Sequence, residues 1–250
     1  MGKQILFAGK ELPFGSDMAS GASFQGRRVL ATSSLIPEDE LEEAGQQSLK
    51  NGAIVGVAWN RSSPLSCRSL ALKCENEGGM DEIVLIFDEF YFATQYRDLN
   101  TARVLEELIG SYQYLTNELL TRLKRQANRK FKLVFLYKPN YSQCDGVNSS
   151  QIRTSGIELS TPLLAAAGGA FKNFAENTAA LLADGGNITP LLVLCEPQND
   201  LSKRDSSLSV WLCEYMDSID NLKKPLSPKQ KVAWVKAGAK NPGGFGILGF

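Results

Sequence analysis

Short apolar runs alternate with helical patterns along most of this chain, and this alternation most constrains its fold. From residue 28 onward, runs such as 82–87 and 131–137 are continuous, as is typical of parallel strands covered on both faces. Between the runs, apolar residues recur at helical spacing, most clearly over 101–125 and 162–183. Short strands joined by crossover helices form a parallel sheet with right-handed connections. The sequence therefore predicts an α/β domain with a doubly wound parallel sheet.

The element boundaries follow from proline, glycine and charge signals at the ends of each pattern. The predicted strands cover 28–32, 53–58, 82–87, 131–137, 191–195 and 231–235, and the predicted helices cover 37–51, 64–78, 101–125, 162–183 and 207–220. Residues 1–26 show no clear periodicity and are predicted to be an irregular N-terminal arm. One domain is then expected to cover 27–250.

Composition excludes several classes of function. Lys+Arg and Asp+Glu both number 27, so the chain offers no broad basic surface for nucleic acid or an anionic membrane. The longest apolar runs are far shorter than the roughly 18 residues of a spanning helix, and Ile5–Ala8 is too short for a secretion signal. A cytoplasmic protein is expected. The chain has no histidine, which removes Ser-His-Asp and Cys-His catalysis, and its five cysteines are predicted to pack as small apolar groups rather than to bind metal.

The order and spacing of these segments resemble the short-chain dehydrogenase/reductase family over about residues 26–240. Residues 26–32 (GRRVLAT) resemble its first strand, 52–61 its second, 80–87 its fourth, 163–182 the helix that carries Tyr-x-x-x-Lys, and 187–197 its sixth strand. The resemblance implies a Rossmann-like sheet that binds NAD(P). Because only one helix fits between the matches to the second and fourth strands, the third strand is predicted to be missing.

The family's nucleotide loop, Thr-Gly-x-x-x-Gly-x-Gly, is not intact in this alignment. With Thr32 at the motif's threonine, its three glycines become Ser33, Pro37 and Asp39, and acidic residues crowd the helix that follows. Side chains there fill space that a pyrophosphate needs, and carboxylates repel it. The remaining candidates for cofactor contact are Thr32, Ser33 and Arg61, the last at a position where relatives contact the 2′-phosphate of NADP.

The family's catalytic positions are also replaced. Leu163 stands for the tyrosine, Ala167 for the lysine and Glu107 for the asparagine, while the serine aligns near Tyr137 or Lys138. None of the first three replacements reproduces the family's proton relay. Two further interpretations rest on polar residues nearby. In the first, a displaced proton donor or ammonium group is supplied by Tyr137, Lys138, Tyr141 or Lys172. In the second, Asp88, Glu89 and Glu107 are either oxygen ligands for a divalent cation or separately solvated carboxylates.

These replacements favour a pseudoenzyme of the short-chain dehydrogenase/reductase type that acts as a scaffold, regulatory protein or oligomer subunit, without a cofactor and without a metal. The alternative is an atypical NADP-dependent oxidoreductase that uses Arg61, and a third possibility is another small molecule in the same groove. Helices 101–125 and 162–183, which pair subunits in the family, predict a homodimer or homotetramer, or pairing with an active relative. The Gly-rich tail 241–250 carries Phe and Leu and is expected to dock on a partner.

Overall fold

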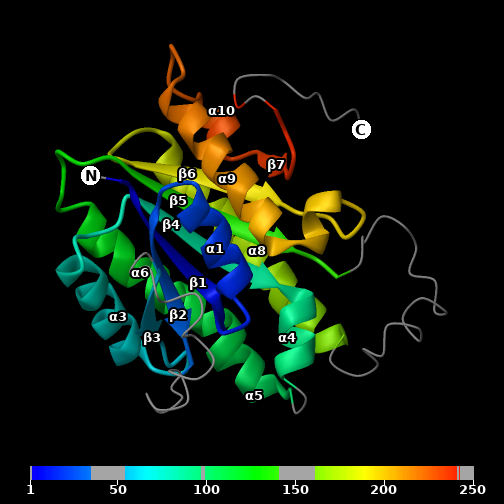
Figure 1. Cartoon of the computed structure of the whole chain (residues 1–250). Helices are drawn as coiled ribbons and strands as arrows, with labels where there is room; N and C mark the ends of the chain where they lie inside the picture. The colour runs from blue at the N-terminus through cyan, green and yellow to red at the C-terminus, as the bar shows by residue number, and fades with distance from the viewer. Residues whose placement is uncertain (1, 35–53, 97–98, 141–160, 241, 243–250) are drawn as a thin grey trace.

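A single parallel sheet organises the chain. The computed structural model describes residues 2–34, 54–96, 99–140, 161–240 and 242. Its strands are β1 (Gln4–Leu12), β2 (Arg28–Ser33), β3 (Ile54–Ala58), β4 (Glu82–Asp88), β5 (Phe131–Lys138), β6 (Ile188–Leu194) and β7 (Trp234–Lys236). They form one sheet in the order β3-β2-β1-β4-β5-β6-β7, and every neighbouring pair is parallel (Figure 1). The predicted doubly wound α/β fold is confirmed.

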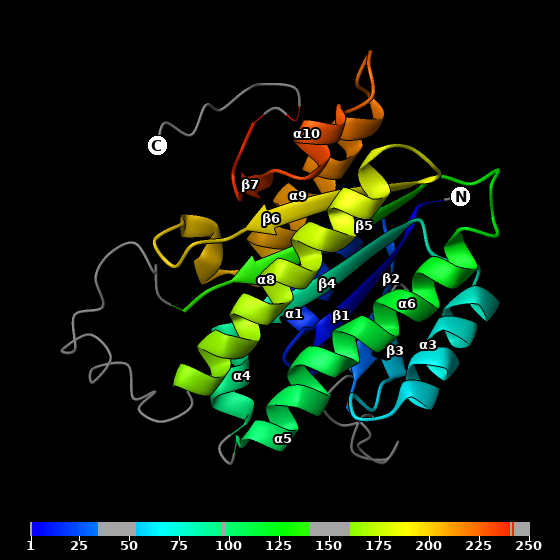
Figure 2. The ribbon, with the colours of Figure 1, turned by 180° about the vertical axis from the view of Figure 1, so that it is seen from behind.

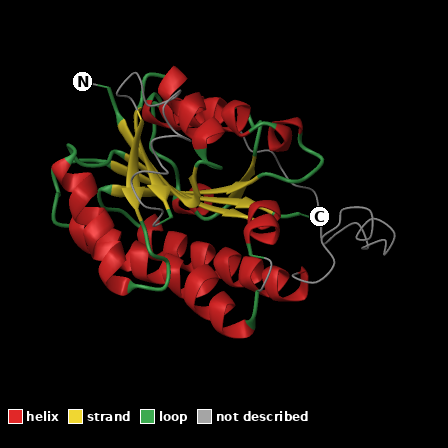
Figure 3. Cartoon of the chain, turned by 60° about the horizontal axis from the view of Figure 1, so that its bottom comes forward, coloured by secondary structure: helices red, strands yellow, loops and turns green. Residues whose placement is uncertain are grey.

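Helices cover both faces of this sheet. Helices α1 (Ser16–Phe24) and α9 (Asp205–Asp220) pack on one face, and α3 (Pro64–Asn76), α6 (Ser111–Leu123) and α8 (Thr161–Ala183) pack on the other (Figures 2 and 3). The shorter helices are α4 (Glu89–Gln95), α5 (Thr101–Arg103), the π-helix η1 (Val104–Gly110), the 3-10 helix η2 (Asp200–Lys203) and α10 (Pro228–Lys231). No helix within the described ranges is both long and apolar enough to span a lipid bilayer.

Burial on both faces explains why the strands read as continuous apolar runs. In β1, Ile5 and Phe7 enter the core beneath α1 and α9, whereas Leu6 and Ala8 enter the core beneath the other helices. All residues of β4 and β5 are buried. A parallel sheet with helices on both sides offers no wet face to polar side chains, so alternation is lost.

Two predictions about the start of the chain are wrong. Residues 1–26 do not form an irregular arm, because Gln4–Leu12 is the central strand β1 and Ser16–Phe24 is the first helix. The third strand is not missing, because 28–33 is β2 and 54–58 is β3. The apolar run of β1 is short, so the local sequence pattern does not reveal it. The strand is buried because β2 and β4 pair with it on either side. The segments that resemble the family's first and second strands are therefore β2 and β3 of this sheet.

Most other elements are confirmed. Helix α3 begins at Pro64, with the Ser63 side chain accepting a hydrogen bond from the Ser66 N–H, as expected of an N-cap. The long helix predicted over 101–125 is α5, η1 and α6 in succession, and 162–183 is α8. The strand predicted at 231–235 begins later, since a capping box at Ser227 starts α10. The helix predicted over 37–51 lies outside the described residues.

Close packing of α1 against α9 depends on Gly21. A Cβ at Gly21 would lie 2.4 Å from the backbone oxygen of Ser206, whereas a Cβ at Gly169 in α8 would have no neighbour within 4 Å. Alanine is the better helix former at both positions by about 1 kcal/mol. At Gly21 a steric clash therefore opposes the gain in helix propensity that alanine would bring, whereas at Gly169 nothing opposes it.

We predict opposite effects for the two matched substitutions. Gly21→Ala should lower the free energy of unfolding by about 1–3 kcal/mol, because the backbone of α9 must move. Gly169→Ala should leave it unchanged or raise it by up to about 1 kcal/mol. Urea denaturation of both variants measures the difference, and a stabilising Gly21→Ala would contradict the packing described.

Candidate functional site

The candidate site lies at the carboxyl ends of the strands, around Gly9–Gly15. These residues form the end of β1 and its turn into α1, and together we call them the turn. In doubly wound sheets ligands bind outside the carboxyl edge, where the strand order reverses. Here that point is β1, which lies between β2 and β4. The turn depends on glycine: Gly9 has a φ of +116°, and a Cβ there would lie 2.1 Å from the Ile86 carbonyl oxygen.

Several N–H groups of this turn donate to acceptors within the chain. The Gly15 N–H donates to the Glu11 carbonyl at 2.9 Å, and the Ser16 N–H donates to the Pro13 carbonyl at 3.0 Å. The Glu11 N–H donates to the Tyr91 hydroxyl at 3.4 Å, and Pro13 has no N–H. A pyrophosphate on a Rossmann turn relies on such donors. This arrangement, as it stands, does not fit that group.

Arg61, just after β3, holds the turn in place through contacts with Glu11 and Gly9. Its guanidinium is buried, its Nε lies 2.7 Å from Glu11 Oε1, and it donates to the Gly9 carbonyl at 2.8 Å. It also stacks on aromatic rings, 4.5 Å from the Trp59 centroid and 5.3 Å from that of Tyr112. Burial alone lowers the pKa of Arg61, but the Glu11 carboxylate and neighbouring phenols raise it well above the ordinary value.

The predicted role of Arg61 as a 2′-phosphate contact does not match this geometry. The residue follows β3 rather than β2, and its charge is already paired inside the protein. Thr32 and Ser33 end β2 and are buried there, so they do not open the nucleotide loop. The Thr32 hydroxyl accepts a hydrogen bond from the Gly9 N–H at 3.5 Å. Pro37, Asp39 and the acidic residues after them lie outside the described residues.

A cleft of about 450 Å³ opens above Arg61, between the turn and α4, and we call it the Arg61 cleft. Aromatic side chains contribute much of its wall. The Glu11–Arg61 ion pair, which carries no net charge, also lines it. Its lining includes Phe14, Trp59, Asn60, Tyr91 and Tyr96.

On the other side of the turn, two lysines and two aspartates form a closed ring of ion pairs, the Lys–Asp ring. Lys10 Nζ lies 2.9 Å from Asp88 Oδ2 and 2.5 Å from Asp205 Oδ2. Lys138 Nζ lies 3.0 Å from Asp88 Oδ2 and 2.6 Å from Asp205 Oδ1. The sheet register creates this arrangement, because Asp88 and Lys138 are direct neighbours at the ends of β4 and β5.

The ring is strongly ionic although it is nearly buried. Burial tends to raise the pKa of Asp88, but the Lys138 and Lys10 ammonium groups lower it below its ordinary value. Burial likewise tends to lower the pKa of Lys138, and its two aspartate partners raise it. The ring lines a second cleft of about 370 Å³, the ring cleft, together with Phe90 and Cys195. Burial raises the pKa of Cys195 to about 11, so its thiol is protonated near neutral pH.

Tyr137 and Glu89 form a third polar group at the same edge, facing α8. The Tyr137 hydroxyl donates to Glu89 Oε1 at 2.6 Å, and the Asn140 N–H donates to Glu89 Oε2 at 2.9 Å. Burial and the Glu89 charge raise the pKa of Tyr137 well above its ordinary value. Gly168 makes room for the pair, because a Cβ there would lie 2.6 Å from Glu89 Oε1.

The residues predicted at the family's catalytic positions do not join these groups. Leu163 packs partly buried against the core, and Ala167 is fully buried in α8. The Glu107 carboxylate pairs with Arg103 at 2.9 Å, while its backbone carbonyl accepts a hydrogen bond from Arg61 at 3.2 Å. Asp88, Glu89 and Glu107 therefore have separate partners and do not form a shared cation site.

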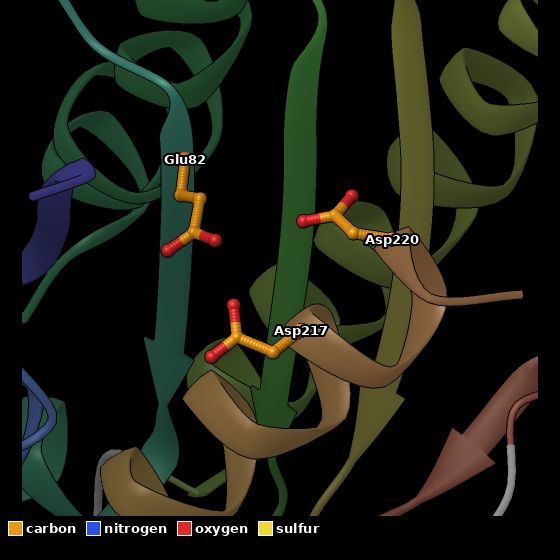
Figure 4. Close-up of side chains that lie close together, drawn as sticks. All are labelled: Glu82, Asp217 and Asp220. Carbon is orange, nitrogen blue, oxygen red and sulfur yellow. The ribbon is translucent and has the colours of Figure 1, made fainter.

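Three carboxylates do meet at the opposite, amino edge of the sheet. Single oxygens of Glu82, Asp217 and Asp220 lie within 4.8 Å of one another (Figure 4). Cations already fill the space between them: Lys3 lies 2.5 Å from Asp217, Arg27 lies 3.2 Å from Glu82 and Lys132 lies 2.6 Å from Asp220. Three positive charges disfavour a metal ion, so this cluster is best explained as an ionic link between α9 and the sheet.

Four cysteines behave as predicted. Cys67, Cys74, Cys195 and Cys213 are free and buried, and Cys144 lies outside the described residues. Tyr141 also lies outside them, and Lys172 is exposed on α8.

Comparisons with known proteins agree with this fold. No family model matches the chain. An uncharacterised protein of Treponema pallidum is 24% identical over 251 residues, which cover 96% of this chain and 95% of that protein.

Two solved structures illustrate the structural likeness. A short chain dehydrogenase from Mycobacterium smegmatis shares 16% identity and a TM-score of 0.62 over 96% of this chain and 93% of its own. A short chain dehydrogenase/reductase from Burkholderia phymatum, in complex with NAD, shares 13% identity and a TM-score of 0.59 over 95% and 89%. The chain thus has the Rossmann-like fold of short-chain dehydrogenases/reductases, as the resemblance implied.

The Lys–Asp ring and the Glu11–Arg61 pair were not predicted from the sequence. One signal was present: Gly9 and Gly15 follow an apolar run at the spacing of the first and third glycines of the family's loop, with Pro13 at the second. The turn was therefore recognisable, but its partners Arg61 and Asp205 lie 50 and 195 residues away from it.

We predict that the ring stabilises the fold only as a complete unit. Asp88→Asn should lower the free energy of unfolding by about 3–5 kcal/mol, because it leaves two nearly buried ammonium groups with Asp205 as their one shared carboxylate. The pKa of Asp88 is depressed in the folded state, so its contribution is present above the unfolded value of about 3.9 and is lost as pH falls below it. The stability difference should narrow below about pH 4 in urea titrations.

Asp200→Asn provides the matched control. Asp200 pairs with Lys203 on the surface, where an ion pair contributes little to stability. Equal losses for the two variants, or no loss for Asp88→Asn, would refute the interpretation of the ring.

Proposed function

We propose that this chain is a non-catalytic protein with the fold of short-chain dehydrogenases/reductases, and that it acts by binding rather than by hydride transfer. The observation that carries this proposal is the turn after β1. The N–H groups of Glu11, Gly15 and Ser16 donate within the chain, and the buried Glu11–Arg61 pair holds the turn in place. A dinucleotide needs free donors at this turn.

The absence of a suitable acid or base supports the same proposal. Between Thr161 and Ala183, the helix that resembles the family's Tyr-x-x-x-Lys segment, the sequence contains no tyrosine. Tyr137 is near the edge of the sheet, but its hydrogen bond to Glu89 and its raised pKa hold its proton tightly. A general acid or base works best with a pKa near the operating pH.

The end of β2 supports it as well. In dinucleotide-binding sheets an acidic side chain there binds the ribose of NAD, or an arginine accepts the 2′-phosphate of NADP. This chain has Ser33, which is buried, followed by Ser34. Neither an acid nor an arginine follows β2 within the described residues.

One observation favours the alternative, an atypical NADP-dependent oxidoreductase. The Arg61 cleft and the ring cleft lie on opposite sides of the turn, with volumes of about 450 and 370 Å³. Two clefts that flank a β1–α1 turn are what the two halves of a dinucleotide require.

Titration with NADH and NADPH separates the two proposals. Trp59 is buried at the Arg61 cleft, so a reduced dinucleotide bound there would accept energy from its fluorescence. We expect no saturable transfer up to about 1 mM cofactor, which corresponds to a binding free energy weaker than about −4 kcal/mol. Trp59→Phe identifies any signal that arises elsewhere.

Turnover supplies the decisive control. If the chain reduces any carbonyl compound with NADPH, and Tyr137→Phe abolishes that activity, the oxidoreductase alternative holds. Micromolar cofactor binding by the unchanged chain would overturn the cofactor part of our proposal.

A binding protein of this fold is proposed to assemble through α6 and α8, as a homodimer or homotetramer or with an active relative. The outward side of α8 supports this, because Ala165, Ala166 and Gly169 are exposed and leave space for close approach of another helix. Leu181, further along α8, is 86% exposed.

We predict that Gly169→Arg converts the assembly to a monomer, because a long charged side chain blocks close helix approach. Light scattering after size-exclusion chromatography measures the mass. Leu72→Arg on α3, also at an exposed position, should leave the mass unchanged. An unchanged mass for Gly169→Arg, or a monomeric parent chain, would rule out assembly through α8.

A further inference from the structure

An apolar groove runs between α1 and α9, on the face of the sheet opposite α8. Its volume is about 510 Å³, and its walls include Phe24, Val210 and Trp211. Gly21 forms part of its floor, because the missing side chain lets the two helices approach each other. The groove is separate from the Arg61 cleft and the ring cleft, which lie at the carboxyl edge of the strands.

Phe24 makes this groove unusual as a free surface. Its side chain is 84% exposed although it stands at the end of a helix that packs on the core. Trp211, across the groove, is only partly buried. Two aromatic residues beside one apolar groove mark a surface that is expected to be covered.

The chain itself leads to this groove. The Trp211 indole N–H donates to the carbonyl oxygen of Ala239 at 3.1 Å, and Ala239 packs against the core beneath α9. Figure 1 shows β7 at the edge of the sheet beside α9. The chain after β7 therefore contacts Trp211, a residue of the groove wall, four residues before the segment 243–250 begins.

The composition and reach of residues 243–250 match the groove. Their sequence, GGFGILGF, contains no charged residue and includes Phe245, Ile247, Leu248 and Phe250. An extended chain spans about 3.3 Å per residue, so eight residues reach about 26 Å. Helix α1 has nine residues and is about 14 Å long, so the segment is long enough to follow it.

We propose that residues 243–250 dock in the α1–α9 groove of their own chain, with their apolar side chains against Phe24 and Trp211. Burial of these side chains provides the driving force, and the contact between Trp211 and Ala239 starts the segment in the right place. The short tether raises the effective concentration of the segment at the groove, which favours the same chain over a second copy.

Thiol labelling tests this arrangement. Ser207 lines the groove, so Ser207→Cys places a reporter there in a Cys144→Ser background, in which the other four cysteines are buried. We expect a chain that ends at Pro242 to react about tenfold faster than the full chain, because local protection slows reaction in proportion to the open fraction. Leu181→Cys, exposed on α8, should react equally fast in both lengths.

A full-length variant guards against a folding effect of the truncation. Phe245→Ser combined with Phe250→Ser should give the faster rate while circular dichroism and the unfolding midpoint remain those of the parent. Equal rates in the full and shortened chains would overturn the proposal. So would protection that disappears on dilution together with a fall in mass, because it would assign the groove to a second copy.

Discussion

The buried guanidinium of Arg61 links the parts of the carboxyl edge that would otherwise move independently. It holds the turn after β1 through Glu11 and the Gly9 carbonyl, and it reaches η1 through the Glu107 carbonyl. Aromatic rings around it exclude water, which makes each of these contacts stronger and each missing one more costly. A charge in this position must keep its partner, so the turn conformation, the path of β3 and the π-helical segment are fixed together.

The Lys–Asp ring applies the same constraint on the other side of the turn. It joins β1, β4, β5 and the start of α9 through two positive and two negative charges, so the edge carries no net charge there. A dinucleotide site uses this region differently, because its fixed donors and charges must remain available to the ligand. Removing one partner of a buried ion pair is strongly destabilising even where the complete pair adds little net stability. The two ionic groups thus fix the turn after β1 from both sides and join it to β4, β5, α9 and the segment after β3.

Local sequence patterns predicted the long helices α3, α6, α8 and α9. They also predicted β4 and β5, because burial on both faces leaves a continuous apolar run in each strand. They failed at β1, where only Ile5–Ala8 form an apolar run and Gly9, Lys10 and Glu11 follow at once. That error shifted the strand numbering and assigned the turn after the first strand to Thr32 instead of Gly9. The partners of the site were beyond local reasoning for a different reason. Arg61 contacts Glu11, and Asp205 contacts Lys10, only because the folded sheet brings these distant parts of the sequence together.

Two neighbouring glycines of α8 have opposite surroundings. A glycine at position 168 is required because Glu89 and Tyr137 occupy the space of a side chain, whereas a glycine at 169 faces open space. Gly168 is therefore in contact with the Glu89–Tyr137 pair, which fills the region between α8 and the sheet edge. Gly169 lies on the exposed outer side of α8. The inner side of α8 thus packs around a buried carboxylate–phenol pair, which fixes the position of the helix on the sheet edge.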